Sequence, residues 1–351
     1  MKIREAILKM GTYKPPLEGR NPKEHLLMDF NESPYPPPDY VQDQLIDFIR
    51  DNRLNVYPSY GDFLELLGRH VGVSPDSLII TNGSDQALEI CLRCFLDPGD
   101  EMVLAKPGFG MFFQIAGTLG AKVISPLYRK DMAFPFEEIK VAVSSKTRLI
   151  VLINPNNPTG TPIALQAIED LLSTFPEQPI LVDEAYFEFT QHTALPLLAS
   201  YSNLIITRTF SKAFAIPSLR LGYAIGRPDF IQHLYKIRGP YDVNMVALVA
   251  ARAQLERPQI WQERIRHIME ESKPTLERFF DESGVTYFKG AAHFMLVQPK
   301  NVQETLEFLK TNGILVRPMS SPIEHTFRVS VGTLEQTQYF ILVYKKYLRQ
   351  S

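Results

Sequence analysis

The sequence predicts an α/β protein, with a large domain built on a mostly parallel sheet covered by helices and a smaller C-terminal α+β domain. From about residue 78, short runs rich in Ile, Val and Leu alternate with stretches of helical periodicity. Strands that are apolar on both faces and separated by helices are typical of a parallel sheet with helices on both sides. After about residue 230 the alternation stops, and helices are followed by a few short strands.

The chain that precedes this alternation predicts little regular structure. Residues 1–40 are rich in Pro, Gly and Asn, with little periodicity. They indicate an irregular arm that is either disordered or packed on something larger, such as a second subunit. Short amphipathic helices are predicted at 41–50 and 63–71.

The elements of the two domains follow from composition and spacing. Strands are predicted at 77–81, 101–105, 121–127, 147–154, 178–184 and 203–209, with helices between them at 85–96, 109–120, 136–145 and 164–175. Helical patterns dominate 230–280, and strands at 294–298, 313–318 and 326–331 follow, with a helix at 302–311. We therefore expect an N-terminal arm with part of the small domain at 1–52, a large domain at 53–250 and a small domain at 251–351.

Composition excludes several classes of protein. The chain has 351 residues, of which 45% are hydrophobic and 22% charged, as in a globular protein with a sizeable core. Lys and Arg (37) nearly balance Asp and Glu (39), which argues against a nucleic-acid-binding protein. No apolar run is long enough to span a bilayer, and residues 1–10 lack the continuous hydrophobic region of a signal peptide. We expect a cytoplasmic protein.

Cysteine and histidine do not indicate redox or metal chemistry. Cys91 and Cys94 have C-x-x-C spacing, but they lie in the middle of a predicted helix, whereas a redox pair opens one. We interpret them as packing residues. The 7 histidines are scattered, with no pair at the spacing of metal ligands, so the sequence predicts no metal site.

Two loops at strand ends are candidate binding sites. In TNGSDQALEI (81–90) a strand is followed by a turn and a helix start, where free backbone N–H groups can bind an anion. Taken alone, this segment is more typical of an ordinary turn with a good N-cap. In NPNNPTG (154–160) the loop follows a strand, at the sheet edge where α/β proteins bind ligands, and its Asn side chains offer amide donors.

Two further segments carry charged residues that such a site would use. LVDEAYFEF (181–189) puts a carboxylate pair at a strand end, either in a structural ion pair or beside a protonated cofactor nitrogen. In RTFSKAFAIPSLRLGYAIG (208–226), Lys212 has apolar neighbours, which lower a lysine pKa and make a usable nucleophile. Thr209, Ser211 and Arg220 of the same segment could hold a phosphate dianion.

The order of these motifs fits one cofactor, pyridoxal 5'-phosphate, which needs a Schiff-base lysine, an anion beside its ring nitrogen and a phosphate cup. With NGSD, NPNNPTG, DEAY, TFSKAF and LRLGYA, the chain resembles the fold-type I aminotransferases. It is most similar to the histidinol-phosphate aminotransferase family, from NESPY (31–35) to RVSVGT (328–333).

The resemblance implies roles for individual residues. Lys212 would bind the cofactor as a Schiff base and later move the proton, and Asp183 would pair with the ring nitrogen. Phe109 would stack on the ring, where the family commonly has a tyrosine. The remaining cofactor contacts would come from Ser84, Asp85, Gln86, Asn157, Tyr186, Thr209, Ser211 and Arg220, and from Tyr57 of a neighbouring subunit. Gln86 stands where the family usually has a glutamate.

The resemblance also implies a substrate pocket and a homodimer with shared sites. Substrate contacts would come from Tyr13, Asn31, Tyr241, Arg317 and Arg328. Two arginines, two tyrosines and an asparagine suit a phosphorylated or dianionic substrate. The expected reaction is ping-pong transamination of histidinol phosphate with 2-oxoglutarate in histidine biosynthesis, giving imidazole acetol phosphate and glutamate.

Two alternatives stay open within the family: an aromatic amino-acid aminotransferase and a threonine-phosphate decarboxylase. The Phe and Tyr content of the arm and pocket keeps the aromatic option. A non-catalytic regulator on the same fold normally carries an added DNA-binding module. The residues that precede the large domain are too few and too Pro-rich for one.

Overall fold

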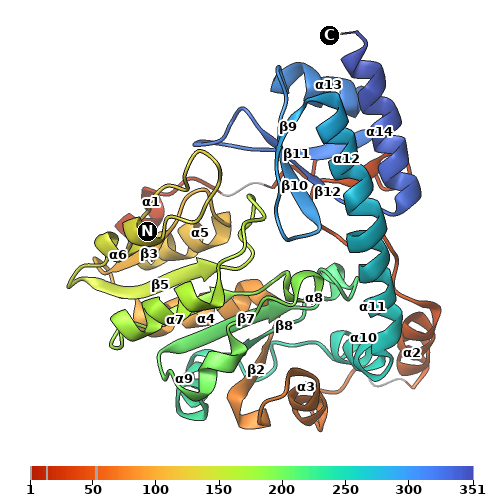
Figure 1. Ribbon diagram of the computed structural model, residues 1–351. Coiled ribbons are helices and arrows are strands. Elements are labelled where there is room, and N and C mark those ends of the chain that lie inside the picture. Colours follow the sequence, from red (N-terminus) through yellow and green to blue (C-terminus); the bar gives the residue numbers. More distant parts are fainter. Residues whose placement is uncertain (1, 13–14, 52–53, 351) are drawn as a thin grey trace.

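The computed structural model describes residues 2–12, 15–51 and 54–350, and places them around two sheets (Figure 1). The larger sheet has seven strands in the order β2-β8-β7-β6-β5-β3-β4. In chain order these are β2 (Leu78–Thr81), β3 (Glu101–Leu104), β4 (Lys122–Ile124), β5 (Thr147–Ile153), β6 (Ile180–Asp183), β7 (Leu204–Thr209) and β8 (Gly222–Ile225). Adjacent strands from β4 to β7 are parallel, and β8 runs antiparallel to both of its neighbours. The predicted mostly parallel sheet is confirmed.

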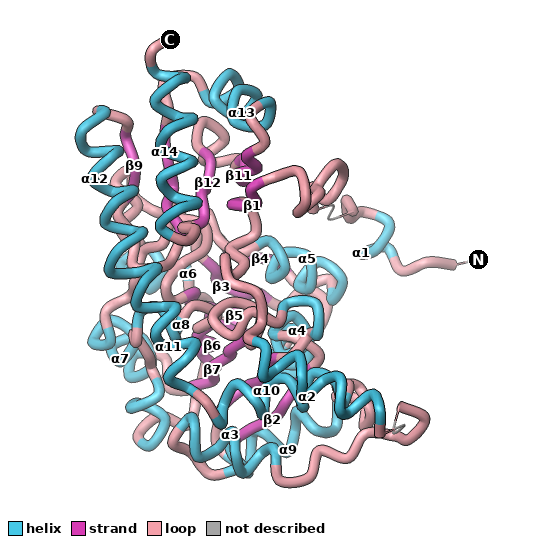
Figure 2. The backbone as a smooth tube through the Cα atoms, turned by 90° about the vertical axis from the view of Figure 1, so that its right-hand side faces the viewer, coloured by secondary structure: helices cyan, strands magenta, loops and turns pink. Residues whose placement is uncertain are grey.

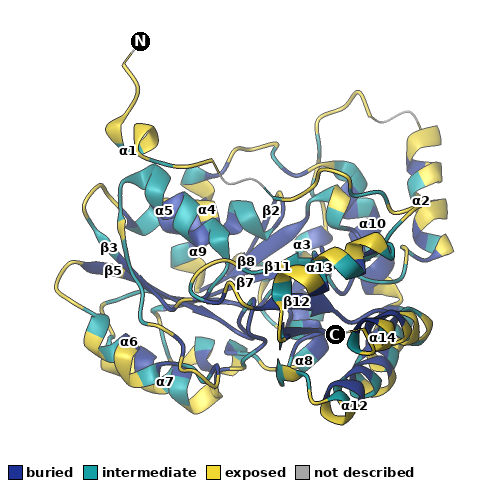
Figure 3. Ribbon diagram, turned by 90° about the horizontal axis from the view of Figure 1, so that it is seen from above, coloured by how far each residue is buried: buried dark blue, intermediate teal, exposed yellow. Residues whose placement is uncertain are grey.

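Helices cover both faces of this sheet, whose strands are the buried layer between them (Figure 3). One face carries α4 (Ser84–Phe95), α5 (Gly110–Leu119) and α9 (Pro228–Ile237), and the other carries α6 (Phe136–Ala142), α7 (Leu165–Thr174) and α8 (Phe187–Thr190). Successive residues of one strand enter separate apolar clusters, as Ile79 and Ile80 do. This alternation explains why the strands are apolar on both faces.

The smaller sheet has the order β1-β11-β12-β10-β9. Its strands are β1 (Leu26–Met28), β9 (Thr286–Phe288), β10 (Phe294–Gln298), β11 (Ile314–Pro318) and β12 (Phe327–Ser330), and it packs with α12 (Lys273–Ser283), α13 (Val302–Thr311) and α14 (Leu334–Leu348). The N-terminal arm thus supplies one strand, β1, which pairs in parallel with β11 (Figure 2). A three-residue strand within a Pro-rich segment leaves too short a pattern for sequence prediction.

A run of helices joins the two sheets. It comprises α10 (Met245–Glu256), α11 (Pro258–Arg266), a π-helical turn (His267–Ser272) and α12, and it climbs along one side of the molecule (Figures 1 and 2). Against α10 pack α2 (Asp39–Arg50) and α3 (Phe63–Val71), near the positions predicted for them. The remaining short helices are α1 (Glu5–Leu8), η1 (Pro75–Ser77), η2 (Leu195–Ala199) and η3 (Pro217–Leu219).

The structure bears in different ways on four details of the prediction: the domain boundaries, one strand, a cysteine and whether any helix can span a membrane. The predicted domain boundary after residue 250 falls inside α10, and the one after residue 52 lies outside the described residues, so the domain boundaries stay a prediction. The strand expected at 121–127 is shorter because it is an edge strand that runs into Pro126. Cys91 is buried within α4. Across the described residues, every helix is too short or too polar to cross a membrane.

Candidate active site

A cavity of about 660 Å³ lies at the carboxyl ends of β5, β6 and β7, with strands β11 and β12 of the smaller sheet on its other side. The carboxyl ends of parallel strands meet at one sheet edge, and ligands of α/β proteins bind there. Most residues predicted for the site line this cavity: Ser84, Asp85, Phe109, Asn157, Asp183, Tyr186, Thr209, Ser211, Lys212, Arg220, Arg317 and Arg328. Motifs far apart in the sequence therefore converge on one space.

Lys212 lies in the loop after β7, and its amine points back toward the N-terminal arm. Its Nζ donates a hydrogen bond to the carbonyl oxygen of Phe30, at 2.8 Å. Burial, and after it the positive charge of Arg328, lower the pKa of Lys212 to about 8. More of the amine is therefore deprotonated near neutral pH than in an ordinary lysine, and the deprotonated form is the one that a nucleophile or a proton acceptor requires.

Asp183 ends β6 and is only 4% exposed. The hydroxyl of Thr207 donates to its Oδ1, at 3.0 Å. Burial raises the pKa of Asp183 to about 7, and the nearby negative charges of Asp85 and Glu184 add to the effect. Among the described residues, no cation forms an ion pair with this carboxylate. A protonated ring nitrogen in the cavity would supply the missing positive charge.

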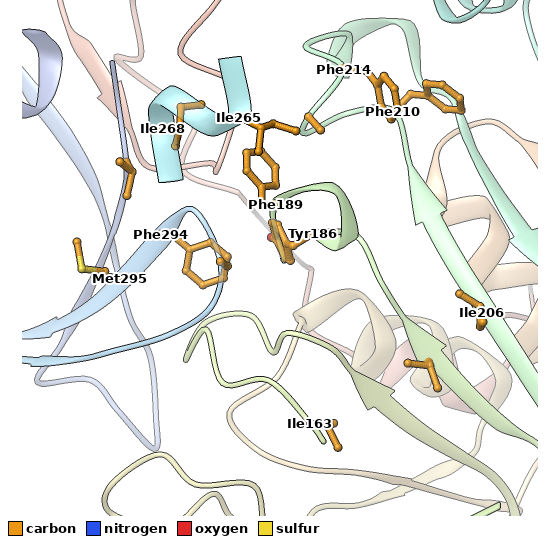
Figure 4. Packing of buried hydrophobic residues seen from close by; sticks show 14 of the residues in the cluster. Ile163, Tyr186, Phe189, Ile206, Phe210, Phe214, Ile265, Ile268, Phe294 and Met295 are labelled. Carbon is orange, nitrogen blue, oxygen red and sulfur yellow. The ribbon is translucent and has the colours of Figure 1, made fainter. Parts of the chain in front are cut away.

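Tyr186 reaches the cavity from the turn after β6. Its ring packs with Phe189 and Phe294 in the apolar cluster between the sheets (Figure 4). Its hydroxyl oxygen accepts hydrogen bonds from the side-chain amides of Asn31, at 3.0 Å, and Asn157, at 3.1 Å. With its acceptor capacity used in this way, the hydroxyl proton can be donated to an oxygen of a bound ligand.

The first turn of α4 forms a cradle with Arg220. Two nitrogens of Arg220 bond Asp85 Oδ2, at 3.1 Å, and Ser211 Oγ, at 3.3 Å. Gly83 has a φ of 78°, and a Cβ there would lie 2.5 Å from Arg220 Nη2. A Cβ on Gly222 of β8 would collide with the backbone nitrogen of Ser84. The glycines therefore let a strand and an arginine approach the free N–H groups of a helix start, an arrangement that fits a phosphate group.

Two arginines face the cavity from the smaller sheet. Arg317 of β11 and Arg328 of β12 are directly opposite each other in the antiparallel pair. Arg328 donates to the carbonyl oxygen of Asp29, at 2.6 Å, and also bonds Asn157. Nη1 of Arg317 is buried and finds no hydrogen-bond partner within the described chain. Two like charges at facing positions destabilise a sheet unless an anion lies between them.

Other described residues that were predicted for the site lie off the cavity wall. Asn31 is buried behind the wall, where it supports Tyr186. The side chain of Gln86 turns away from the cavity and bonds Asp242. Tyr57 and Tyr241 are 76% and 58% exposed, and their rings lie 4.5 Å apart on the surface. Tyr13 falls outside the described residues.

Sequence reasoning missed two residues that line the cavity, Phe30 and Lys106, and one that lies behind its wall, His293. The carbonyl of Phe30 holds Lys212, but a backbone group leaves no signature in a sequence. Lys106, which also lines the cavity, lies 4.9 Å from the centre of the Phe113 ring. His293 is completely buried, and its Nε2 lies 3.1 Å from the carbonyl oxygen of Asn31. In the sequence, the only indication for Lys106 is its position before PGFGMF, and the only one for His293 is its position before the strand at 294–298.

Comparison with known proteins gives this geometry a context. Residues 23–342 match the family model described as aminotransferase class I and II. The histidinol-phosphate aminotransferase of Limosilactobacillus fermentum is 34% identical over 99% of this chain and 100% of that protein. A dihydroxyacetone phosphate transaminase of Campylobacter jejuni is 33% identical over 90% of this chain and 88% of that protein.

The fold is also that of solved proteins. The histidinol-phosphate aminotransferase of Sinorhizobium meliloti, in complex with pyridoxal-5'-phosphate, superposes with a TM-score of 0.88 at 23% identity. The match covers 99% of this chain and 98% of that one. The similarity extends through both sheets and the helices that join them.

Proposed function

The chain belongs to the aminotransferase class I and II family and is a pyridoxal-phosphate-dependent enzyme, and on that premise we propose that it transaminates histidinol phosphate with 2-oxoglutarate. The reaction is ping-pong, with both substrates using one site in turn. It would belong to histidine biosynthesis. The products would be imidazole acetol phosphate and glutamate.

One observation carries the choice of a phosphorylated substrate: the facing pair Arg317 and Arg328. A phosphate dianion between these side chains would relieve their mutual repulsion and give Arg317 Nη1 the partner it lacks among the described residues. The relatives support the same chemistry, because histidinol-phosphate aminotransferases and the dihydroxyacetone phosphate transaminase are both named for phosphorylated substrates. An aromatic amino acid carries only one anionic group, its carboxylate, and has no second anion for this pair of arginines to bind.

The cavity residues fit the cofactor in distinct ways. When bound, pyridoxal phosphate supplies a reactive aldehyde and an electron-accepting ring. The cradle of α4 with Thr209, Ser211 and Arg220 would hold its phosphate, and Asp183 would keep a proton on its ring nitrogen. Asn157 and Tyr186 would donate to its phenolic oxygen, and Phe109, at the start of α5, would cover the ring face.

Lys212 would have two tasks. Its partly deprotonated amine would hold the cofactor through the aldehyde, and once freed by the substrate the same Nζ would accept a proton from the reacting carbon and return it at another. The carbonyl of Phe30 would orient the amine while it is free of the cofactor. Burial brings the pKa of Lys212 closer to neutral pH, which suits both directions of proton transfer.

We also propose a homodimer with shared sites. Tyr57 and Tyr241 form an exposed aromatic pair, together with the exposed Leu54 and Val56. Aromatic residues that protrude in this way are typical of a subunit interface. A twofold dimer would bury this surface and bring Tyr57 to the neighbouring site. The cytoplasmic location stays a prediction.

The proposed substrate is tested by a half-reaction screen. The cofactor-loaded protein is mixed with histidinol phosphate, histidinol, phenylalanine, tyrosine, glutamate or threonine phosphate, and the cofactor absorbance is followed. Histidinol phosphate should react at least tenfold faster than histidinol, because a lost charge-assisted bond costs roughly 1.5–3 kcal/mol. The reverse half-reaction is run with 2-oxoglutarate and with dihydroxyacetone phosphate.

Two outcomes would contradict the proposal. A faster reaction with phenylalanine or tyrosine would favour the aromatic aminotransferase, and release of CO₂ from threonine phosphate would favour the decarboxylase. Arg317→Ala should slow the reaction with histidinol phosphate far more than the reaction with phenylalanine, whereas Arg328→Ala should slow both half-reactions. Equal losses for both donors in Arg317→Ala would make Arg317 a structural residue.

A further inference from the structure

We propose that Gln86 and Asp242 form a positioning pair that fixes the first turn of α4 for the cofactor phosphate. The inference rests on the proposed assignment of this turn to the phosphate, and not on the identity of the substrate. It explains a predicted site residue whose side chain leaves the cavity. It also explains why position 86 carries an amide and not a carboxylate.

The side chain of Gln86 uses both halves of its amide. Its Oε1 accepts a hydrogen bond from the backbone N–H of Asn82, at 2.6 Å, in the turn before α4. Its Nε2 donates to Asp242 Oδ2, at 2.7 Å. An ionised carboxylate at position 86 could accept from Asn82 but could not donate to Asp242. Only a side chain with an acceptor and a donor satisfies both partners.

Asp242 is itself held in place. Its Oδ1 accepts from Arg238 Nε, at 2.7 Å, and the exposed fractions of the two side chains are 13% and 3%. The guanidinium of Arg238 lies 4.9 Å from the centre of the Tyr60 ring. The hydroxyl of Tyr60 accepts from the backbone N–H of Val243, at 3.3 Å. The turn before α4 is thereby tied to a braced segment, 238–243, rather than to solvent.

A second tether holds the same turn from the other side. Asp85 accepts from Arg220, which also bonds Ser211. The free N–H groups of α4 therefore lie between two tethers, one through Arg220 and one through Asp242. Pre-organised donors bind an anion more tightly because binding then costs less ordering entropy. Losing the tether through Asp242 should weaken phosphate binding without removing any group that contacts phosphate.

The test exchanges the donor and the acceptor of the pair, and the double variant keeps the net charge of wild type. Gln86→Glu places a carboxylate against Asp242 and removes the donor. The double variant Gln86→Glu with Asp242→Asn restores one donor and one carboxylate, with their positions exchanged. The dissociation constant of pyridoxal phosphate is measured on cofactor-free protein by equilibrium dialysis. We expect Gln86→Glu to weaken binding at least tenfold and the double variant to return within about threefold of wild type.

Two controls separate positioning from general damage. Gln166→Glu makes the same change next to Asp170 on the exposed surface of α7, where Gln166 donates to Asp170 at 3.0 Å, and should leave the affinity unchanged. Pyridoxal, which lacks the phosphate, should bind Gln86→Glu and wild type equally well. An equal loss for pyridoxal, a double variant as weak as Gln86→Glu, or a Gln86→Glu affinity within twofold of wild type would each overturn the proposal.

The assignment on which the pair rests has its own readout. Arg220→Ala should weaken the binding of pyridoxal phosphate and leave the binding of pyridoxal unchanged. If it spares both, α4 does not hold the phosphate, and the cofactor assignment fails independently of the pair. The substrate screen is unaffected by any of these outcomes.

Discussion

Two adjacent carboxylates, Asp183 and Glu184, are both buried at the end of β6, yet their surroundings are opposite. Asp183 faces the cavity, with one hydrogen bond from a threonine. Glu184 is 0% exposed on the other face of the sheet and accepts from Arg208, Thr193 and the backbone of Ala194. The partners of Glu184 offset much of the cost of burying its charge, whereas a buried carboxylate without a cation is suited to a cationic ligand.

The neighbouring strand repeats this division. Thr207 of β7 turns to Asp183, and Arg208 turns to Glu184, at 2.9 Å from Nη2 to Oε2. Arg208 also covers the ring of Phe187, at 3.6 Å, and its charge acts on the buried Glu188. Alternation along a strand thus separates a binding face from a structural face within two residues. Burial alone therefore does not identify a functional carboxylate.

Removing the cation on the structural face should have the largest effect on stability. Arg208→Met leaves Glu184 buried without its ion pair, and we expect the free energy of unfolding to fall by about 3–5 kcal/mol. Urea denaturation of the cofactor-free protein measures the change. Arg252→Met, which breaks an exposed pair with Asp62, is the control and should cost less than about 1 kcal/mol. Similar losses for both variants would show that the ion pair of Glu184 matters no more than an exposed one.

Neutralising the carboxylate on the binding face should have the opposite sign. The pKa of Asp183 is raised from 3.8 to about 7, so between these values the folded protein binds more protons than the unfolded chain. Stability therefore falls as pH rises through this window, and Asp183→Asn removes the fall. We expect cofactor-free Asp183→Asn to be more stable than wild type by on the order of 2 kcal/mol at pH 8.

The same urea experiment at pH 4.5 supplies the contrast. At pH 4.5 the carboxyl group of Asp183 is still mostly protonated in the folded protein, so its burial costs little. The stability advantage of Asp183→Asn over wild type should therefore shrink. Turnover should nevertheless fall by more than tenfold, because the ring nitrogen loses its anion. A variant that is less stable than wild type at pH 8 would show that Asp183 is held like Glu184.

Lys212 offers a chemical test of the binding face. Its pKa is lowered to about 8 by burial, so in cofactor-free protein it should react with acetic anhydride with a midpoint near pH 8. Nα-acetyl-lysine amide in the same reaction, with an ordinary pKa of about 10.4, is the reference. Mass spectrometry of the digest reports the extent of labelling. A midpoint above pH 10 would mean that the cavity does not perturb the amine.

Thr207→Val should have the smallest effect. It removes one hydrogen bond to Asp183 and keeps the shape of the side chain, so we expect a loss of about 1 kcal/mol at pH 8. Because that bond lowers the pKa of Asp183, its loss should also raise this pKa further. Urea denaturation across pH gives both quantities. No change in the pH dependence would show that Thr207 does not support the carboxylate.

Local patterns in the sequence are enough to predict the elements and the order of the motifs. Apolar runs with β-branched residues marked the strands of the larger sheet, and their ends located NPNNPTG, Asp183 and Lys212 at one edge. This works because hydrophobic periodicity and turn chemistry are local, and because parallel strands must end together. The gathering of these motifs in one cavity could therefore be expected from the chain alone.

Which groups from distant parts of the sequence meet depends on the tertiary fold. The pairing of β1 with β11 brings the carbonyl of Phe30 to Lys212, and the register of β11 with β12 sets Arg317 against Arg328. Likewise Gln86 meets Asp242 only because segment 238–243 returns to α4. Such contacts depend on packing between distant segments and on backbone atoms, which carry no residue signature, so no local pattern encodes them.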